Sequence, residues 1–210
     1  MLPVGDENSP RRSFPFMTYI LIGINLVVFF LELSRGTAFI ERWAFIPSRF
    51  SSDPSGNLIT IFTAMFMHAG GFHLFSNMLY LWIFGDNVEG RFGHFRYVFF
   101  YIISGVAATL AFLFFSPGSS APLVGASGAI AGVLAAYFIM FPKRNIKVLM
   151  GLWLIPLKAW IVIGVWFVLQ LFSGWASIDS AAETGGVAYV AHVGGFVAGF
   201  VLTFVFRKKK

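Results

Sequence analysis

The stretch VAYVAHVGGFVAGFVLTFVF, residues 187–206, is followed directly by the basic residues RKKK at 207–210. It is an apolar run of about the 20 residues that a helix needs to cross the hydrocarbon core of a bilayer. Basic residues directly after such a run are typical of a membrane anchor. Its one strongly polar side chain is His192. A polar group inside a membrane helix is costly, so this histidine needs a reason.

The composition of the whole chain also indicates a membrane environment. Of the 210 residues, 58% are hydrophobic and 11% are charged, and the mean hydropathy is +0.79. A soluble domain carries about 25% charged residues, so this chain has more apolar surface than a water-soluble fold can bury. The net charge of +6 sits at the ends of apolar runs, which argues against a nucleic-acid partner. The absence of Cys excludes disulfides, thiolate catalysis and Cys-ligated metal.

Six apolar stretches predict an all-α, polytopic membrane protein with six transmembrane helices. They are residues 16–33, 72–88, 95–115, 127–141, 159–172 and 187–206. If the N-terminus is cytoplasmic, only three of the fifteen Lys and Arg residues fall in outer segments: Arg35, Arg42 and Arg49. The positive-inside rule therefore predicts that both termini are cytoplasmic. We expect a short cytoplasmic tail at 1–15, a membrane core at 16–206 and a basic cytoplasmic tail at 207–210.

Polar side chains in three of these stretches fall at one depth. Ser127, His192 and Asn77 each precede the inner end of their helix by 14 or 15 residues. At a rise of 1.5 Å per residue, all three lie about 21–23 Å above the inner edge, toward the outer leaflet. A scatter of tolerated polar residues would not share one depth, so the alignment predicts a polar site inside the membrane.

Small residues predict which helices touch. Gly128 and Gly132 form a small-xxx-small pair on the fourth predicted helix, and Gly195 and Gly199 form another on the sixth. Such pairs allow helices to cross closely in lipid. Because His192 shares a helix face with the second pair, close packing would carry His192 toward the start of the fourth helix.

Three motifs, in order along the chain, carry a resemblance to a known family. They are His68-x4-His73-x3-Asn77, GASG at 125–128, and His192 followed by VGGFVAG at 193–199. GDNVEG at 85–90 resembles the turn after the second helix in the same family. On these motifs the chain, over roughly residues 16–206, resembles the rhomboid family of intramembrane serine proteases, in particular bacterial members with a six-helix core.

The resemblance implies a role for each matching residue. Ser127 is the expected nucleophile and His192 the general base. The expected oxyanion hole consists of His73, Asn77 and the backbone N–H of Ser127. Supporting or packing roles fall to Gly125, Gly128, Gly132, Gly195, Gly199 and His68. No acidic residue lies near His192 in the sixth stretch, so we expect a dyad rather than a triad.

The resemblance also implies partners and location. The substrates would be transmembrane segments of other proteins, cut near the outer face of a bacterial inner membrane. No cofactor, metal or nucleic acid is expected, and the sequence has no His-Glu-x-x-His zinc motif. Two other functions stay open: a catalytically silent rhomboid-like module that binds membrane proteins, and a small transporter or channel.

Two positions depart from the family pattern. Many rhomboids have an aromatic residue one turn after the nucleophile, packed on the histidine, whereas this chain has Ala131. Phe196 or Tyr189 are the candidate replacements. Many rhomboids also have Trp-Arg in the first outer loop, whereas this chain has the reverse order at 42–43. We expect that loop, about 35–71, to lie on or in the outer interface.

The fifth stretch is expected to be the wall that moves to admit a substrate. By family resemblance it borders the site, and from Ile161 to Phe172 it lacks the paired small residues that allow close packing. Leu171 and Phe172 are expected to hold this wall closed. The polar loop at 173–186 is expected to cap the site from above.

Overall fold

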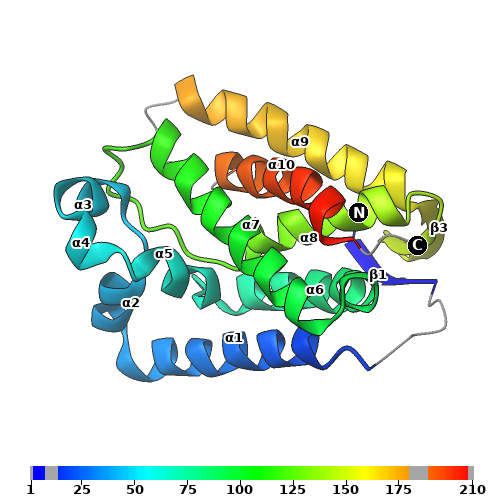
Figure 1. The fold of residues 1–210 in the computed structure, drawn as a ribbon, viewed down its shortest axis with the longest axis horizontal. Helices are drawn as coiled ribbons and strands as arrows, with labels where there is room; N and C mark the ends of the chain where they lie inside the picture. The colour runs from blue at the N-terminus through cyan, green and yellow to red at the C-terminus, as the bar shows by residue number, and fades with distance from the viewer. Residues whose placement is uncertain (1, 8–13, 180–188, 208–210) are drawn as a thin grey trace.

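The computed structural model describes residues 2–7, 14–179 and 189–207. Its elements in chain order are β1 (Leu2–Asp6), α1 (Phe16–Arg35), α2 (Thr37–Trp43), α3 (Pro47–Ser52), α4 (Pro54–Asn57), α5 (Thr60–Thr63), the 3-10 helix η1 (Ala64–Phe66), α6 (Gly71–Phe92), α7 (His94–Phe115), α8 (Ser127–Met140), β2 (Asn145–Met150), β3 (Trp153–Lys158), α9 (Ala159–Asp179) and α10 (Tyr189–Phe206). The predicted all-α class is confirmed. Long helices form a bundle, with the short helices α2–α5 at one end and a small sheet at the other (Figure 1).

Each of the six predicted stretches contains one long helix, with differences at the ends. α6 stays helical to Phe92, so segment 85–90 is helix and not the turn expected from the sequence. α9 extends beyond its predicted end at residue 172. The predicted start of the sixth stretch, Val187, lies outside the described residues, as do the basic residues 208–210.

The lengths of these helices fit a bilayer to different degrees. Within the described ranges, α1, α7 and α10 are each long and apolar enough to cross by themselves. α6 qualifies together with the preceding segment Pro54–Phe66, from which it is bent by 75°. α8 and the segment Ala159–Trp175 of α9 are apolar but shorter. A bundle of such helices is what an integral membrane protein requires, and six crossings remain a prediction.

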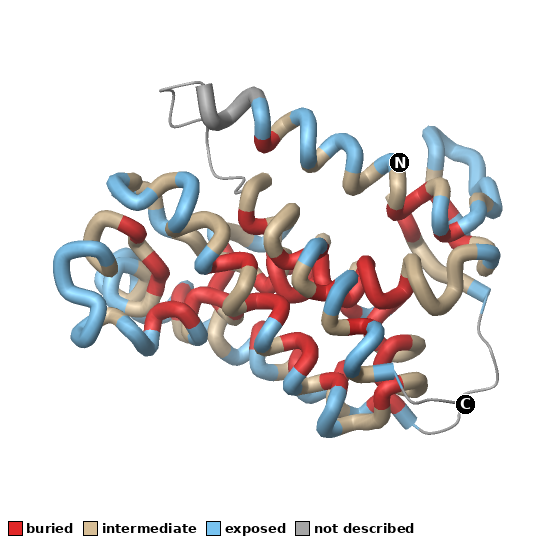
Figure 2. Tube along the Cα trace, turned by 45° about the horizontal axis from the view of Figure 1, so that its top comes forward, coloured by how far each residue is buried: buried red, intermediate tan, exposed pale blue. Residues whose placement is uncertain are grey.

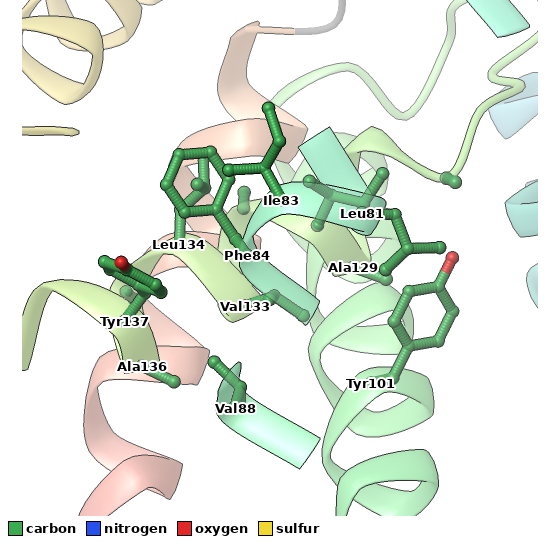
Figure 3. Packing of buried hydrophobic residues seen from close by; sticks show 14 of the residues in the cluster. Leu81, Ile83, Phe84, Val88, Tyr101, Ala129, Val133, Leu134, Ala136 and Tyr137 are labelled. Atoms are coloured by element: carbon green, nitrogen blue, oxygen red, sulfur yellow. The ribbon is translucent and has the colours of Figure 1, made fainter. Parts of the chain in front are cut away.

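α8 is the central helix of the bundle. Every residue from Gly128 to Tyr137 is buried, and α8 packs against α6, α7, α9 and α10. Buried residues gather in the middle of the molecule in Figure 2, and Figure 3 shows α8 side chains meeting those of α6 and α7. One such contact joins the rings of Phe84 and Tyr137, whose centroids lie 5.0 Å apart. Because protein surrounds α8, the helix does not have to match the thickness of the lipid.

The glycines of α8 and α10 allow these two helices to cross in backbone contact. A Cβ built on Gly195 would lie 2.0 Å from the carbonyl oxygen of Gly128. A Cβ on Gly199 would lie 2.4 Å from the Cα of Gly132. Neither space admits a side chain, so the crossing depends on glycine. It brings the first turns of α10 beside the start of α8.

A buried carboxylate joins the ends of three helices. Glu89 of α6 is fully buried. It accepts hydrogen bonds from the backbone N–H groups of Met17 and Thr18 at 3.1 and 2.8 Å and from the hydroxyl of Thr18 at 2.7 Å, and it lies 2.6 Å from His94 Nδ1. A carboxylate at a helix N-terminus satisfies free N–H groups and is favoured by the helix dipole. Glu89 thereby caps α1 and ties it to α6 and α7.

The segment between α1 and α6, predicted to be an outer loop, is built from short helices that pack on the bundle. Phe45 is buried and pairs its backbone with Leu123, through N–H···O bonds of 3.2 and 2.8 Å. Arg49 donates to the carbonyl of Ala44 at 2.7 Å and also to that of Glu41. The guanidinium of Arg49 and the pairing of Phe45 with Leu123 therefore pin the loop.

Residues of the expected N-terminal tail form a strand that the sequence analysis did not predict. β1 pairs antiparallel with β2, which pairs antiparallel with β3. Asp6, at the end of β1, accepts a hydrogen bond from the hydroxyl of Tyr137 at 2.6 Å and lies 3.5 Å from the guanidinium of Arg144. This anchors the strand to the C-terminal end of α8. Residues 8–13 of the tail lie outside the described residues.

Candidate active site

Ser127 begins α8 directly after a turn that requires glycine. Gly125 has φ +131°, which L side chains rarely adopt. A Cβ at this position would lie 2.9 Å from Cε1 and 3.0 Å from Nε2 of His73. Ala126 precedes the helix with no side-chain cap, so the N–H groups of the first turn have no side-chain acceptor at the N-cap. The turn therefore presents Ser127 and its N–H next to the ring of His73.

The structure brings Ser127 and His192 together. His192 Nε2 lies 2.7 Å from Ser127 Oγ, a hydrogen-bond distance, although the two residues are far apart in the chain. The glycine crossing of α8 and α10 sets this approach. A serine hydroxyl beside a histidine ring nitrogen is the arrangement that allows proton removal from the nucleophile.

His73 presents a donor to the same space. The backbone N–H of Ala69 donates to His73 Nδ1 at 3.4 Å, so the ring proton is on Nε2. That Nε2 is the ring nitrogen nearest to Gly125. A hydrogen-bond donor at this position can stabilise negative charge that develops beside Ser127.

Asn77 and His68 both contact His73. Asn77 is buried, and its amide N–H donates to the carbonyl of His73 at 3.1 Å, one turn earlier in α6. His68 packs its ring edge-on to His73, with centroids 5.1 Å apart. The backbone N–H of His68 donates to both carboxylate oxygens of Glu32, at 3.0 and 3.2 Å. These contacts hold His68 in place as a support for the His73 ring.

The sequence analysis missed Gln170. Its amide oxygen lies 2.7 Å from His192 Nδ1, on the opposite side of the imidazole from Ser127. Gln170 is the one strongly polar residue of the apolar stretch 159–172. A strongly polar residue is costly in a membrane helix, and that cost singled out His192 in the sixth stretch. The same signal could have identified Gln170.

The aromatic support of His192 also differs from the expectation. The ring beside His192 is that of Trp166 on α9, with centroids 6.0 Å apart and planes 35° apart. Phe196 stacks instead on Phe167, at 4.1 Å and 20°. Within the part of the chain that the structure describes, neither Phe196 nor Tyr189 makes a ring contact with His192. α9 therefore supplies the support that Ala131 cannot.

The two residues expected to hold the fifth helix closed differ in exposure. Phe172 is 72% exposed and lies mostly outside the contacts of α9 with the bundle, whereas Leu171, at 44%, is more than half covered. α9 packs inward through Ile163, Phe167 and Gln170. The C-terminal part of the expected cap, 180–186, lies outside the described residues.

Comparisons with known proteins agree with these motifs. A family model described as Rhomboid domain matches residues 55–209. Rhomboid protein 1, mitochondrial, of Saccharomyces cerevisiae is 30% identical over 188 residues, which cover 87% of this chain and 51% of that protein. Rhomboid protease GluP of Bacillus subtilis is 32% identical over 193 residues, which cover 90% of this chain and 35% of that protein. The chain thus spans about a third to a half of the length of these relatives.

Proposed function

This chain belongs to the rhomboid family, and on that premise we propose that it is an active intramembrane serine endopeptidase with Ser127 and His192 as its catalytic pair. The observation that carries the proposal is the 2.7 Å contact between Ser127 Oγ and His192 Nε2. The family includes a named protease, and the apolar helices make this chain an integral membrane protein.

In the proposed reaction, His192 acts first as a base and then as an acid. Nε2 takes the proton of the Ser127 hydroxyl as Oγ bonds to the carbonyl carbon of the scissile peptide. His192 then gives this proton to the amide nitrogen, the C–N bond breaks, and the acyl group stays on Ser127 as an ester. A water molecule repeats the sequence: it loses a proton to His192 and attacks the ester, and Ser127 leaves with its proton restored.

The tetrahedral intermediates carry a negative oxygen that needs aimed donors. The backbone N–H of Ser127 and the Nε2–H of His73 are the donors that the resting geometry supports. Asn77 joins them if its amide turns from the carbonyl of His73 toward the oxyanion. We propose these three groups as the oxyanion hole.

The proposed substrates are transmembrane segments that unwind near the outer face. Ser127 is the first residue of α8, and the strands β2 and β3 follow the opposite end of that helix (Figure 1). We propose that both termini are cytoplasmic and that the membrane is a bacterial inner membrane; the relatives include bacterial and mitochondrial proteins. A helix must expose a carbonyl before it can be cut, so we expect cleavage beside small or helix-weakening residues.

The test of this proposal is labelling by a fluorescent phosphonate that reacts with activated serine. The purified protein in detergent is expected to take one label at Ser127, identified by mass spectrometry. Ser127→Ala should abolish the label, and His192→Ala should slow it strongly because the hydroxyl loses its base. A full-length protein that folds but takes no label would favour the silent binding module, and labelling unchanged by Ser127→Ala would contradict the assignment.

A second prediction concerns the oxyanion hole. Asn77→Ala is expected to reduce turnover about 10²–10³-fold if Asn77 is a strong donor, with thermal stability nearly unchanged. Ser76→Ala is the matched control, because the Ser76 hydroxyl donates to the same carbonyl of His73, at 3.0 Å. Turnover of a transmembrane reporter and melting temperature should be measured for both variants. Equal loss in the two would mean that Asn77 acts through the His73 carbonyl and not on the oxyanion.

A further inference from the structure

The imidazole of His192 is held from both sides, by residues of two different helices. Ser127 of α8 meets Nε2 at 2.7 Å, and Gln170 of α9 meets Nδ1 at 2.7 Å. The amide oxygen of Gln170 can only accept, so Nδ1 carries the proton. Nε2 then has its lone pair directed at the Ser127 hydroxyl, which is the tautomer a general base requires.

We propose that Gln170 is a positioning residue, a third and uncharged member of the site that fixes the tautomer and orientation of His192. This inference rests on the proposed function and deepens it. A carboxylate could accept the same hydrogen bond from Nδ1. Burying an isolated charge, however, costs far more free energy than burying a hydrogen-bonded amide. An amide oxygen therefore orients the ring without placing an ion inside the membrane.

The packing of α9 on α10 holds Gln170 level with the His192 ring. Trp166 precedes Gln170 by one helical turn and lies beside the His192 ring. Phe167 stacks on Phe196 of α10 at 4.1 Å. On the other face, Leu169 is 57% exposed. Gln170 thus belongs to the face of α9 that docks on α10, and not to the lipid-facing side.

The contact between Gln170 and His192 depends on the position of α9, and this links it to substrate entry. α9 lies along the outside of the bundle beside α10 (Figure 1) and packs on α10 and α8. If α9 moves away to admit a substrate helix, Nδ1 of His192 loses its acceptor and the ring is free to change tautomer. The site is then complete only when α9 has closed again, so docking of α9 and proton transfer are coupled through Gln170.

Two variants of Gln170 separate positioning from packing. Gln170→Leu keeps the size and removes the acceptor, and kcat is expected to fall about 10- to 100-fold, the usual cost of losing a partner that orients a functional histidine. KM should stay near the wild-type value, because Gln170 does not touch the substrate. Leu169→Ala, on the lipid-facing side, is the control and should keep wild-type kcat.

Gln170→Glu supplies a readout that mere packing would not change. It keeps an acceptor at Nδ1, so kcat should exceed that of Gln170→Leu. The added carboxylate stabilises the imidazolium, so the acid limb of the kcat/KM profile should move to higher pH. Among the described residues, His73 of α6 is the titratable side chain that acts electrostatically on His192. Around Gly194 and Gly195, next to His192, α7 and α8 present Ala107, Ala108, Ala111 and Gly128, none of which titrates. These surroundings are common to all variants and cancel in the comparison.

The rates should be measured with purified full-length protein in detergent, on a transmembrane reporter, beside the melting temperature of each variant. Wild-type kcat in Gln170→Leu would overturn the inference. So would equal losses in the two variants with an unmoved acid limb, since that result indicates packing alone. If Gln170→Leu does not fold, the pH profile of Gln170→Glu still decides. Ser127→Ala tests the proposed function separately: an inactive Ser127→Ala beside a fully active Gln170→Leu rejects only the role of Gln170.

Discussion

Ser127→Ala is expected to reduce cleavage of a transmembrane reporter to background, a loss on the order of 10⁶-fold in kcat if chemistry limits turnover. The change removes the atom that attacks the carbonyl, and no other described hydroxyl stands beside His192 Nε2. His192→Ala should cost about as much, because a nucleophile and its base act as a unit, and the double variant should be no worse than either.

Both variants should fold, which keeps this result interpretable. Neither substitution leaves an unpaired charge, and Ser127→Ala removes a single oxygen atom. Melting temperatures in detergent should therefore stay close to the wild-type value. Ser76→Ala, a serine on α6 outside the pair, is the control for loss of a hydroxyl. Undiminished proteolysis by purified Ser127→Ala would end the assignment of protease activity to this site.

Gly199→Val is expected to have the largest effect on stability. A Cβ at this position would lie 2.4 Å from Cα and 2.6 Å from the carbonyl oxygen of Gly132. Both are backbone atoms, which cannot move aside as a flexible side chain would. Overpacking of a core costs about 1–3 kcal/mol, and here α10 must also shift away from α8. The melting temperature in detergent should fall, and activity should fall with it because His192 rides on α10.

The matched control for this variant is Gly23→Val on α1, where a Cβ would have no atom within 4 Å. It introduces the same residue into a helix without the collision, so its melting temperature should stay close to that of the wild type. Unchanged stability and activity in Gly199→Val would mean that the contact between α8 and α10 is not what positions His192.

Local signals in the sequence were sufficient for the class of fold and for choosing most residues of the candidate site. Apolar runs mark the long helices because the bilayer demands continuous apolar segments. Ser127, His192 and Asn77 stood out because polar groups in such runs are costly. The paired glycines identified the helices that cross, since close approach in lipid requires small residues at a fixed spacing. Each of these signals can be read along one helix, without knowledge of its neighbours.

What only the tertiary structure decided are contacts that depend on how elements are rotated and paired. α9 is apolar all round, so its sequence has no stripe that tells which side faces the bundle. The docking of Phe167 on Phe196 sets that rotation, which turns Gln170 toward His192 and leaves Phe172 exposed. β1 contains proline and glycine, which disfavour strands, and it exists because it pairs with β2, distant in the chain. The sequence determined which helices form and where their polar groups lie, whereas side-chain packing decided which groups meet.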